Sequence, residues 1–209
     1  MREVIEEILH FQCGHNYSLP LNIEALCRSL GLTLRPLSDI VRESGMSAAE
    51  ICALWGNPDG ALQRLGGRSL ICFNDARPPR RQRFTLCEEA AHHLLGHLDE
   101  PGFSAFSQDY REEVYQRCEE EARFAAGMLL CPPRWYFAQE PGPGERALMR
   151  RCEVSLACAR HIRADYARFG AEIRACPTFG FVPINAETRR PSASPAGKKT
   201  CKSGADTVK

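Results

Sequence analysis

The chain lacks any long uninterrupted run of apolar residues. Hydrophobic residues make up 44% of its 209 positions, but no stretch approaches the roughly 20 apolar residues that a helix needs to cross a bilayer. The opening MREVIEEILHF mixes charges of both signs with apolar residues and offers no apolar core of a secretory signal. We therefore expect a cytoplasmic protein that contacts no membrane.

The chain also lacks paired cysteines. It contains eleven cysteines, a high and odd number, but they are scattered singly and no CxxC pair occurs. This spacing argues against a zinc ribbon and against a dithiol redox site. In a reducing compartment most of these residues are expected to act as small buried hydrophobes.

A surplus of positive charge is missing from most of the chain. The formal net charge is +1, and the segment from Ala186 to Lys209 contains six Lys or Arg and two acids. The remainder has 21 basic and 24 acidic residues, a balance of −3. Nucleic-acid-binding domains are generally basic, so we expect no direct binding of nucleic acid.

The length predicts one domain, and the composition predicts a tail. We expect residues 1–175 to fold together and residues 176–209, whose later part is rich in Pro, Ser, Ala, Lys and Thr, to form a basic, disordered tail. Periodicity, caps and breakers predict mostly helix with two short strands. The predicted helices are 1–10, 22–30, 81–98, 109–130, 145–152 and 156–169, and the predicted strands are 32–37 and 69–73. The stretch 46–67 is ambiguous.

The most informative segment is RQRFTLCEEAAHHLLGH, from Arg81 to His97. It resembles the HExxH helix of zinc peptidases, in which two histidines four positions apart grip one metal and the glutamate between them activates water. Here Glu88 stands at the first histidine position, followed by Glu89 and His92. A carboxylate oxygen is an acceptable zinc ligand, so the change weakens the motif without excluding a metal. The alternative for Glu88 is a solvent-facing acid near a helix start, where the helix dipole favours it.

His93 and His97 form a competing pair, also four positions apart. We interpret them as solvated or core-edge histidines because no third ligand is placed for them. Cys87 adjoins the motif, but on a helix it points about 140° away from His92 and is a poor ligand.

Glu121 strengthens the case for a metal. On the helix predicted for 109–130, with Asp109 and Glu112 as a capping box, the buried stripe contains Val114, Cys118, Ala125 and Met128, and Glu121 falls inside it. An ionised carboxylate there needs a partner. A metal shared with His92 and a salt bridge to Arg117, one turn earlier, are equally acceptable partners.

Taken in order, these segments resemble the ImmA/IrrE family of metallopeptidases. RFTLCEEAAHHLLGH is similar to the family's RFTLAHELGHLLLGH, and EARFAAGMLLCP, from Glu121 to Pro132, is similar to its EANxFAxxLLMP. ICFND before the first motif and CEVSLACARHIR after the second add support, and the resemblance covers about residues 22–170. It implies a small zincin-like α+β domain, mostly helical with a short β-sheet.

The resemblance also implies a site and a function. It makes Glu88, His92 and Glu121 the metal ligands and Glu89 the general base of a zinc endopeptidase, and the anionic Glu88 favours harder ions such as manganese. Family members cleave helix-turn-helix repressors and so release genes of mobile elements or stress responses. The strand at 69–73 could pair with an extended substrate.

Two other functions stay open. The first is a degenerate pseudopeptidase that binds a repressor without cutting it, although retention of Glu89, His92 and Glu121 favours an enzyme. Alternatively, ALMRRCEVSLACARHI is a DNA-binding helix-turn-helix with Arg160 and Arg163 on its second helix. Helix pairs of this spacing are more often plain packing units, so we place this reading last.

Overall fold

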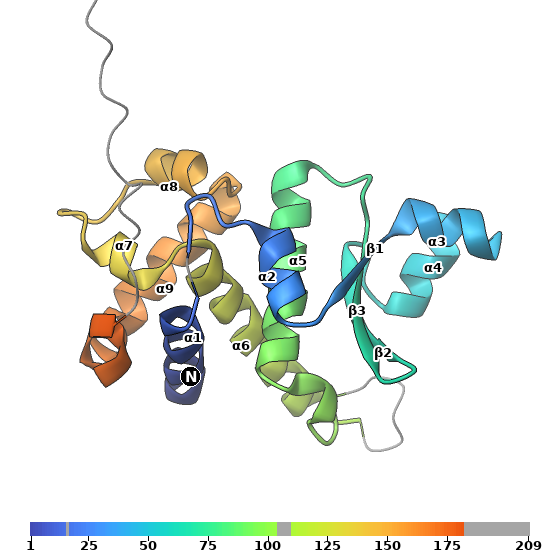
Figure 1. Ribbon diagram of the computed structural model, residues 1–209, viewed down its shortest axis with the longest axis horizontal. Coiled ribbons are helices and arrows are strands. Elements are labelled where there is room, and N and C mark those ends of the chain that lie inside the picture. The colour runs from blue at the N-terminus through green and yellow to red at the C-terminus, as the bar shows by residue number, and fades with distance from the viewer. Residues whose placement is uncertain (16, 104–109, 182–209) are drawn as a thin grey trace, which may run out of the picture.

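The fold was obtained as a computed structural model, which describes residues 1–15, 17–103 and 110–181 (Figure 1). Its helices are α1 (Arg2–Cys13), α2 (Ile23–Ser29), α3 (Leu37–Ser44), α4 (Ala48–Trp55), α5 (Pro79–Leu94), α6 (Glu112–Leu130), α7 (Pro133–Phe137), α8 (Glu145–Arg151) and α9 (Leu156–Ala175), with short 3₁₀ turns η1 (His97–Asp99) and η2 (Pro177–Phe181). The strands are β1 (Thr33–Pro36), β2 (Gly60–Leu65) and β3 (Arg68–Phe73). The predicted α+β class, mostly helical with a short sheet, is confirmed.

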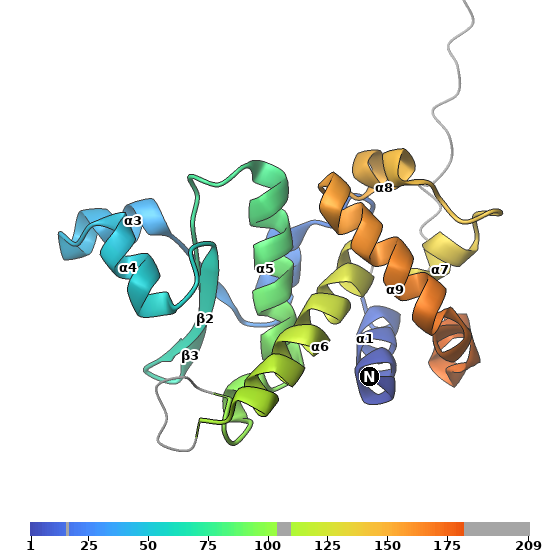
Figure 2. The same cartoon turned by 180° about the vertical axis from the view of Figure 1, so that it is seen from behind.

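The sheet stands beside the long helix α5. Figures 1 and 2 show α5 on one side of the sheet and the short α3–α4 pair on the other, while α6 crosses α5 and leads toward α1, α7, α8 and α9. The molecule therefore has a small sheet-containing half and a larger helical half. The pair α5 and α6 joins them.

The strand order in the sheet is β1, β3, β2. β3 is parallel to β1, with Thr33 opposite Leu70, and antiparallel to β2, with Gly60 opposite Phe73. Because both sides of β3 are occupied, the predicted strand at 69–73 cannot accept an added substrate strand, and that expectation was wrong. Within the described residues β1 and β2 are the two edge strands of the sheet, and the outer edge of β2 is unpaired there.

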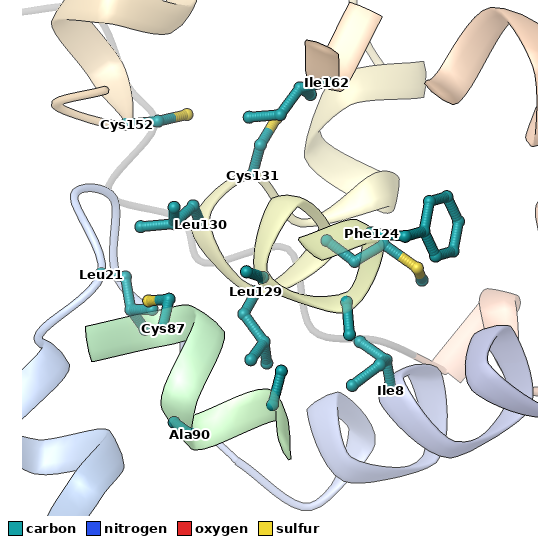
Figure 3. Packing of buried hydrophobic residues seen from close by; sticks show 14 of the residues in the cluster. Ile8, Leu21, Cys87, Ala90, Phe124, Leu129, Leu130, Cys131, Cys152 and Ile162 are labelled. Carbon is teal, nitrogen blue, oxygen red and sulfur yellow. The ribbon is translucent and has the colours of Figure 1, made fainter. Parts of the chain in front are cut away.

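The core lies where α1, α5 and α6 meet. Figure 3 shows Cys87 and Ala90 of α5, Leu129 of α6 and Ile8 of α1 gathered around the same centre. The contact face of α6 carries Ala122, Ala125 and Ala126, and that of α5 carries Ala90 and Ala91, all fully buried. Small side chains let two helices approach closely, so α5 and α6 bring their flanking polar residues together.

Helix α5 ends earlier than predicted. Proline at its first turn supplies a favourable start, but Gly96 adopts the left-handed conformation with φ 72° and turns the chain into η1. The predicted helix to residue 98 was therefore wrong at its end, and His97 is not on the helix. For α6, the predicted cap Asp109 lies outside the described residues, and the helix begins at Glu112 after Arg111.

The α8–α9 pair follows the prediction at its start and departs from it at its end. Ser155 caps α9 as expected, accepting a hydrogen bond of 3.1 Å from the backbone N–H of Cys158. Gly170 does not stop the helix, which continues to Ala175. A Cβ at Gly170 would lie 3.1 Å from the Phe137 ring. The glycine thus allows α7 to approach closely.

The ambiguous stretch 46–67 forms α4 and β2. Ser47 and Glu50 make a complete capping box at the start of α4, a signal that the sequence carries.

The helices α3 and α7 were not predicted. In the predicted tail, η2 packs against α1, α7 and α9, and residues 182–209 lie outside the described part of the chain. No helix among the described residues is long and apolar enough to span a membrane.

Gly60 offers a test of how β2 is fitted against α5. A Cβ at this position would lie 2.7 Å from Cγ2 of Thr85 and 2.8 Å from the carbonyl oxygen of Cys72. We expect Gly60→Ala to lower the free energy of unfolding by about 1–3 kcal/mol, measured by urea denaturation, because the backbone of β3 must shift. Gly180→Ala, where nothing lies within 4 Å, is the control. Equal stability of both variants would contradict this packing.

Candidate active site

A cavity of about 370 Å³ opens between β2, α5 and α6. Its acidic and imidazole side chains are Glu89 and His92 of α5 and Glu119 of α6, and Asn57 adds an amide. Its apolar lining includes Trp55, Ala61, Leu62, Leu98, Phe103, Tyr110 and Tyr115. The cavity therefore combines two acids and an imidazole with an aromatic wall and the free edge of the sheet.

Helix geometry places Glu89 and His92 together, because residues three apart share a face. Both side chains are buried, with 7% and 3% of their surfaces exposed. His92 Nε2 lies 3.5 Å from Oε1 of Glu119 on the neighbouring helix. The close α5–α6 packing thus sets the imidazole of one helix against the carboxylate of the other.

Glu88 and Glu89 lie close to other acids and have few positively charged neighbours. Burial, and then the nearby Glu88 and Glu119, raise the pKa of Glu89 to about 8 against an opposing hydrogen bond from the Leu62 backbone. Burial and then Glu119 raise the pKa of Glu88 to about 7, against the attraction of nearby arginines. Among the residues that the structure describes, neither Glu88 nor Glu89 has an ion pair within 4.0 Å. A cation at this place would relieve their repulsion.

His92 is held in its neutral form. Burial and, to a smaller extent, His97 lower its pKa to about 3. Neutral imidazole is the form that binds metals. One imidazole nitrogen with surrounding carboxylate oxygens is a donor set that zinc accepts and that manganese also accepts. The residues at the cavity therefore fit a divalent cation in their chemistry, with His92, Glu119 and the adjacent Glu88 as the groups that would hold it.

The structure distributes the predicted site residues over two places. Glu89 and His92 line the cavity, and Glu88 lies near Glu119 without lining it. Glu121 lies elsewhere: its Oε2 is 3.4 Å from His97 Nε2 and 3.3 Å from Nη1 of Arg117. The ligand atoms of Glu88, His92 and Glu121 are thus not brought together, and the salt bridge to Arg117 is present.

The tightest group of potential ligands is a different one. In the described part of the chain, only His97, Cys118 and Glu121 place one ligand atom each within 4.8 Å of the other two. The sequence interpretation of His93 and His97 as a helical pair was wrong, because α5 ends before residue 97. His97 is 4% exposed and its Nδ1 lies 2.9 Å from Nδ1 of His92.

Sequence reasoning missed Glu119, although a signal was available. Glu119 precedes Ala122 and Ala126 by three and seven residues, so it continues the alanine stripe by which α6 meets α5. The stripe used in the prediction runs through Val114, Cys118, Ala125 and Met128 and shares only Ala125 with this face. On a helix Glu119 and Glu121 point about 160° apart, and only the packing of α6 on α5 decides which of them reaches His92.

The α8–α9 pair forms a packing unit in the described structure. Arg160 and Arg163 of α9 lie 3.5 and 3.6 Å from the same oxygen of Glu145 on α8. Glu153 in the connecting turn has a φ of 54°. Cross-helix pairing of these arginines accounts for their positions without a nucleic acid.

A HExxH-like helix crossed by an acidic helix, beside the free edge of a small mixed sheet, defines a zincin-like domain of the metallopeptidase class. The family model of the IrrE N-terminal-like domain, a peptidase family, matches residues 54–162. This is just over half of the 209 residues, and the chain belongs to this family. No match to a curated protein was found.

The buried acids predict how stability depends on pH. The folded-state pKa values of Glu88 and Glu89 lie above the ordinary 4.5, so their contribution to stability is full below that value and is lost as pH rises through about 7 to 8. His92 acts oppositely, because its lowered pKa costs stability as pH falls below 6.5. We expect the unfolding free energy of metal-free protein, measured with urea, to decline between about pH 6.5 and 8.5.

The control for this decline is Glu89→Gln, which removes the most strongly shifted acid and should flatten the curve. Added zinc or manganese should also flatten it, because a cation favours the ionised acids. A metal-free wild type whose stability stays level or rises over this interval would contradict the electrostatics described.

Proposed function

We propose that this chain is a metal-dependent endopeptidase that cleaves a helix-turn-helix repressor. In this proposal His92, Glu119 and Glu88 hold a zinc or manganese ion, and Glu89 is the general base. The observation that carries the proposal is that Glu89, His92 and Glu119 line one cavity next to the free edge of β2. Glu119 takes the ligand role that the family resemblance implied for Glu121.

The free edge of β2 can present a peptide to this cavity. An extended segment that adds to a sheet edge forms backbone hydrogen bonds with it, independent of side-chain identity. Ala61 and Leu62 belong to β2 and also line the cavity. A peptide bound along this edge therefore passes beside Glu89. Tyr115 and Phe103 would favour an apolar side chain next to the cleaved bond.

A bound cation would polarise the scissile carbonyl and stabilise the negative charge that develops on its oxygen. Glu89 then takes the proton of the attacking water and delivers it to the leaving amine nitrogen. Its burial suits both steps, because a raised pKa makes the carboxylate a stronger base and a ready proton donor afterwards. The aromatic wall keeps bulk water away from the reacting groups.

Glu88 distinguishes this chain from the usual pattern of its family. An anionic ligand neutralises more of the cation's charge than imidazole does, which reduces its power as a Lewis acid. Carboxylates also shift the preference toward harder ions. We therefore propose a weaker zinc enzyme than a HExxH protein would be, or one that works with manganese.

A repressor-binding protein without peptidase activity is the second candidate. It is favoured by Glu88 at the histidine position and by the ligand atoms of Glu88, His92 and Glu119, which do not meet within 4.8 Å in the described structure. The two candidates share the substrate-binding edge and differ in the metal and in the cleavage step. Metal content and proteolysis therefore separate them.

Glu89→Gln tests the base. The substrate for this test is a helix-turn-helix repressor encoded beside the gene for this chain. We expect its cleavage by metal-loaded protein, followed on gels, to fall by about 10²–10⁴-fold, because general base catalysis contributes about this much. Bound metal, measured by elemental analysis, should be retained. Glu120→Gln changes an exposed acid of α6 and should leave the rate unchanged. Equal cleavage by the Glu89 variant and wild type would exclude this role.

Glu88→His tests whether residue 88 contacts the metal. Under the proposal the substitution restores the HExxH pattern, and we expect tighter zinc binding, measured by competition with a chromogenic chelator, together with faster cleavage. Arg80→His, on the exposed first turn of α5, is the matched control for adding a histidine. An unchanged zinc affinity of the Glu88 variant would remove residue 88 from the ligand set.

A further inference from the structure

A second group of metal-binding side chains lies next to His97, and the proposed function does not use it. The Nδ1 atom of His97 lies 2.9 Å from Nδ1 of His92, and its Nε2 atom lies 3.4 Å from Oε2 of Glu121. His97, Cys118 and Glu121 each offer one ligand atom, and these three atoms lie within 4.8 Å of one another. Nitrogen, sulfur and oxygen donors therefore meet at one place.

Two neighbouring elements bring these donors together. Cys118 and Glu121 are three residues apart on α6 and so share a face of that helix. His97 comes from η1, because the left-handed turn at Gly96 ends α5 and redirects the chain. Cys118 and His97 are buried, and 16% of the Glu121 side chain is exposed. The group is thus enclosed on the side of the core and open to solvent at its carboxylate.

The spacing suits a tetrahedral ion. Zinc lies at about 2.0–2.2 Å from nitrogen and oxygen ligands and at about 2.3 Å from sulfur, which sets neighbouring ligand atoms about 3.3–3.8 Å apart. The contact of 3.4 Å between His97 and Glu121 already has this length. A pair that is at most 4.8 Å apart needs to close by only about 1–1.5 Å. Small side-chain rotations therefore complete the site.

The surrounding charges also suit a divalent cation. Arg117 places Nη1 3.3 Å from Oε2 of Glu121 and Nη2 2.7 Å from Oε1 of Glu100. Glu100 balances the charge of this guanidinium. Glu121 and a thiolate at Cys118 then balance the two charges of the cation. Ligating carboxylates commonly accept such an outer hydrogen bond, which holds them in position.

We infer that His97, Cys118 and Glu121 bind a soft divalent cation such as zinc, at a site separate from the cavity. Water fills the fourth position of the tetrahedron, and the thiol proton is released to solvent on binding. A thiolate ligand selects zinc over manganese. This site goes beyond the proposed function and does not depend on it.

The cation would hold η1 between the sheet and α6. Asp99 of η1 already contacts β2, since Arg64 Nη1 lies 2.6 Å from its Oδ1 and Nη2 lies 3.0 Å from its Oδ2. A metal at His97 would tie the same turn to α6. Leu98, between these two residues, lines the cavity. The second site is therefore a structural one that fixes part of the cavity wall.

The alternative is that these side chains only contact one another. Glu121 then serves as the partner of the His97 imidazole, and Cys118 is one more small buried hydrophobe. The two interpretations differ at the sulfur. The described lining of the cavity contains no cysteine, so a metal bound there does not imitate the sulfur signal.

Cobalt(II) reports sulfur ligation, because a bound thiolate gives it an ultraviolet charge-transfer band that nitrogen and oxygen ligands do not give. We expect this band, with the amplitude of one thiolate per chain, when cobalt is added to metal-free full-length protein in a phosphine reductant. Cys118→Ala should abolish the band. Cys13→Ala, which removes a half-buried thiol of α1, should retain it. A wild type without the band, or a band that survives in Cys118→Ala, would overturn the site.

Cobalt affinity, measured on the same band, tests the other two ligands. Glu121→Gln and His97→Gln should each weaken binding by more than about 100-fold, because loss of an outer-shell partner alone costs about 10–100-fold. Glu120→Gln, at an exposed neighbouring position, should bind as the wild type does. Zinc should displace cobalt and manganese should not. Unchanged affinity in Glu121→Gln, with thermal unfolding showing a folded variant, would refute this ligand set.

The second site and the proposed peptidase fail separately. A cobalt–thiolate band in a chain that cleaves no repressor with zinc or manganese would uphold the site and refute the peptidase. Repressor cleavage by manganese-loaded protein that shows no band with cobalt would refute the site and leave the peptidase standing.

Discussion

The close contact between α5 and α6 is the constraint on which the site depends. Fully buried alanines on both helices let their backbones approach, and the polar residues at the edge of this contact then have no room to separate. His92 meets Glu119 for that reason. A larger side chain in the alanine stripe would move the imidazole and the carboxylate apart before it disturbed any other part of the cavity.

The same contact accounts for the unusual electrostatics. Burial in apolar surroundings disfavours ionised carboxylates and raises the pKa values of Glu88, Glu89 and Glu119. Glu119 raises the pKa values of Glu88 and Glu89 further. A fold that needed only stability would place apolar residues here. Clusters of perturbed acids beside a cavity are typical of functional sites, and in a metallopeptidase family the natural use of such a cluster is to hold a cation.

Most helix and strand positions could be predicted from the sequence, but the way in which α5 and α6 pack against each other could not. Caps at Ser155 and the motif helix around His92 follow from short-range patterns, and the family resemblance rested on segments read in order. The choice between Glu119 and Glu121 required the orientation of α6 around its own axis, which is set by long-range packing. The burial of His97 depended on Gly96, whose left-handed turn removes residue 97 from the helix. A glycine four residues after His92 signals such an end, so this error could have been avoided.

Glu121 shows how an acid in the inward stripe of a helix finds partners within the protein. Its position in the stripe predicted that the carboxylate would have a partner, since burying an unpaired charge is costly. The partner is Arg117 on one side and His97 on the other. A chain of contacts therefore runs from Glu119 at the cavity through His92 and His97 to Glu121 and Arg117. Because each buried polar group in this chain depends on the next for a partner, a change at Arg117 near the surface is felt at the cavity.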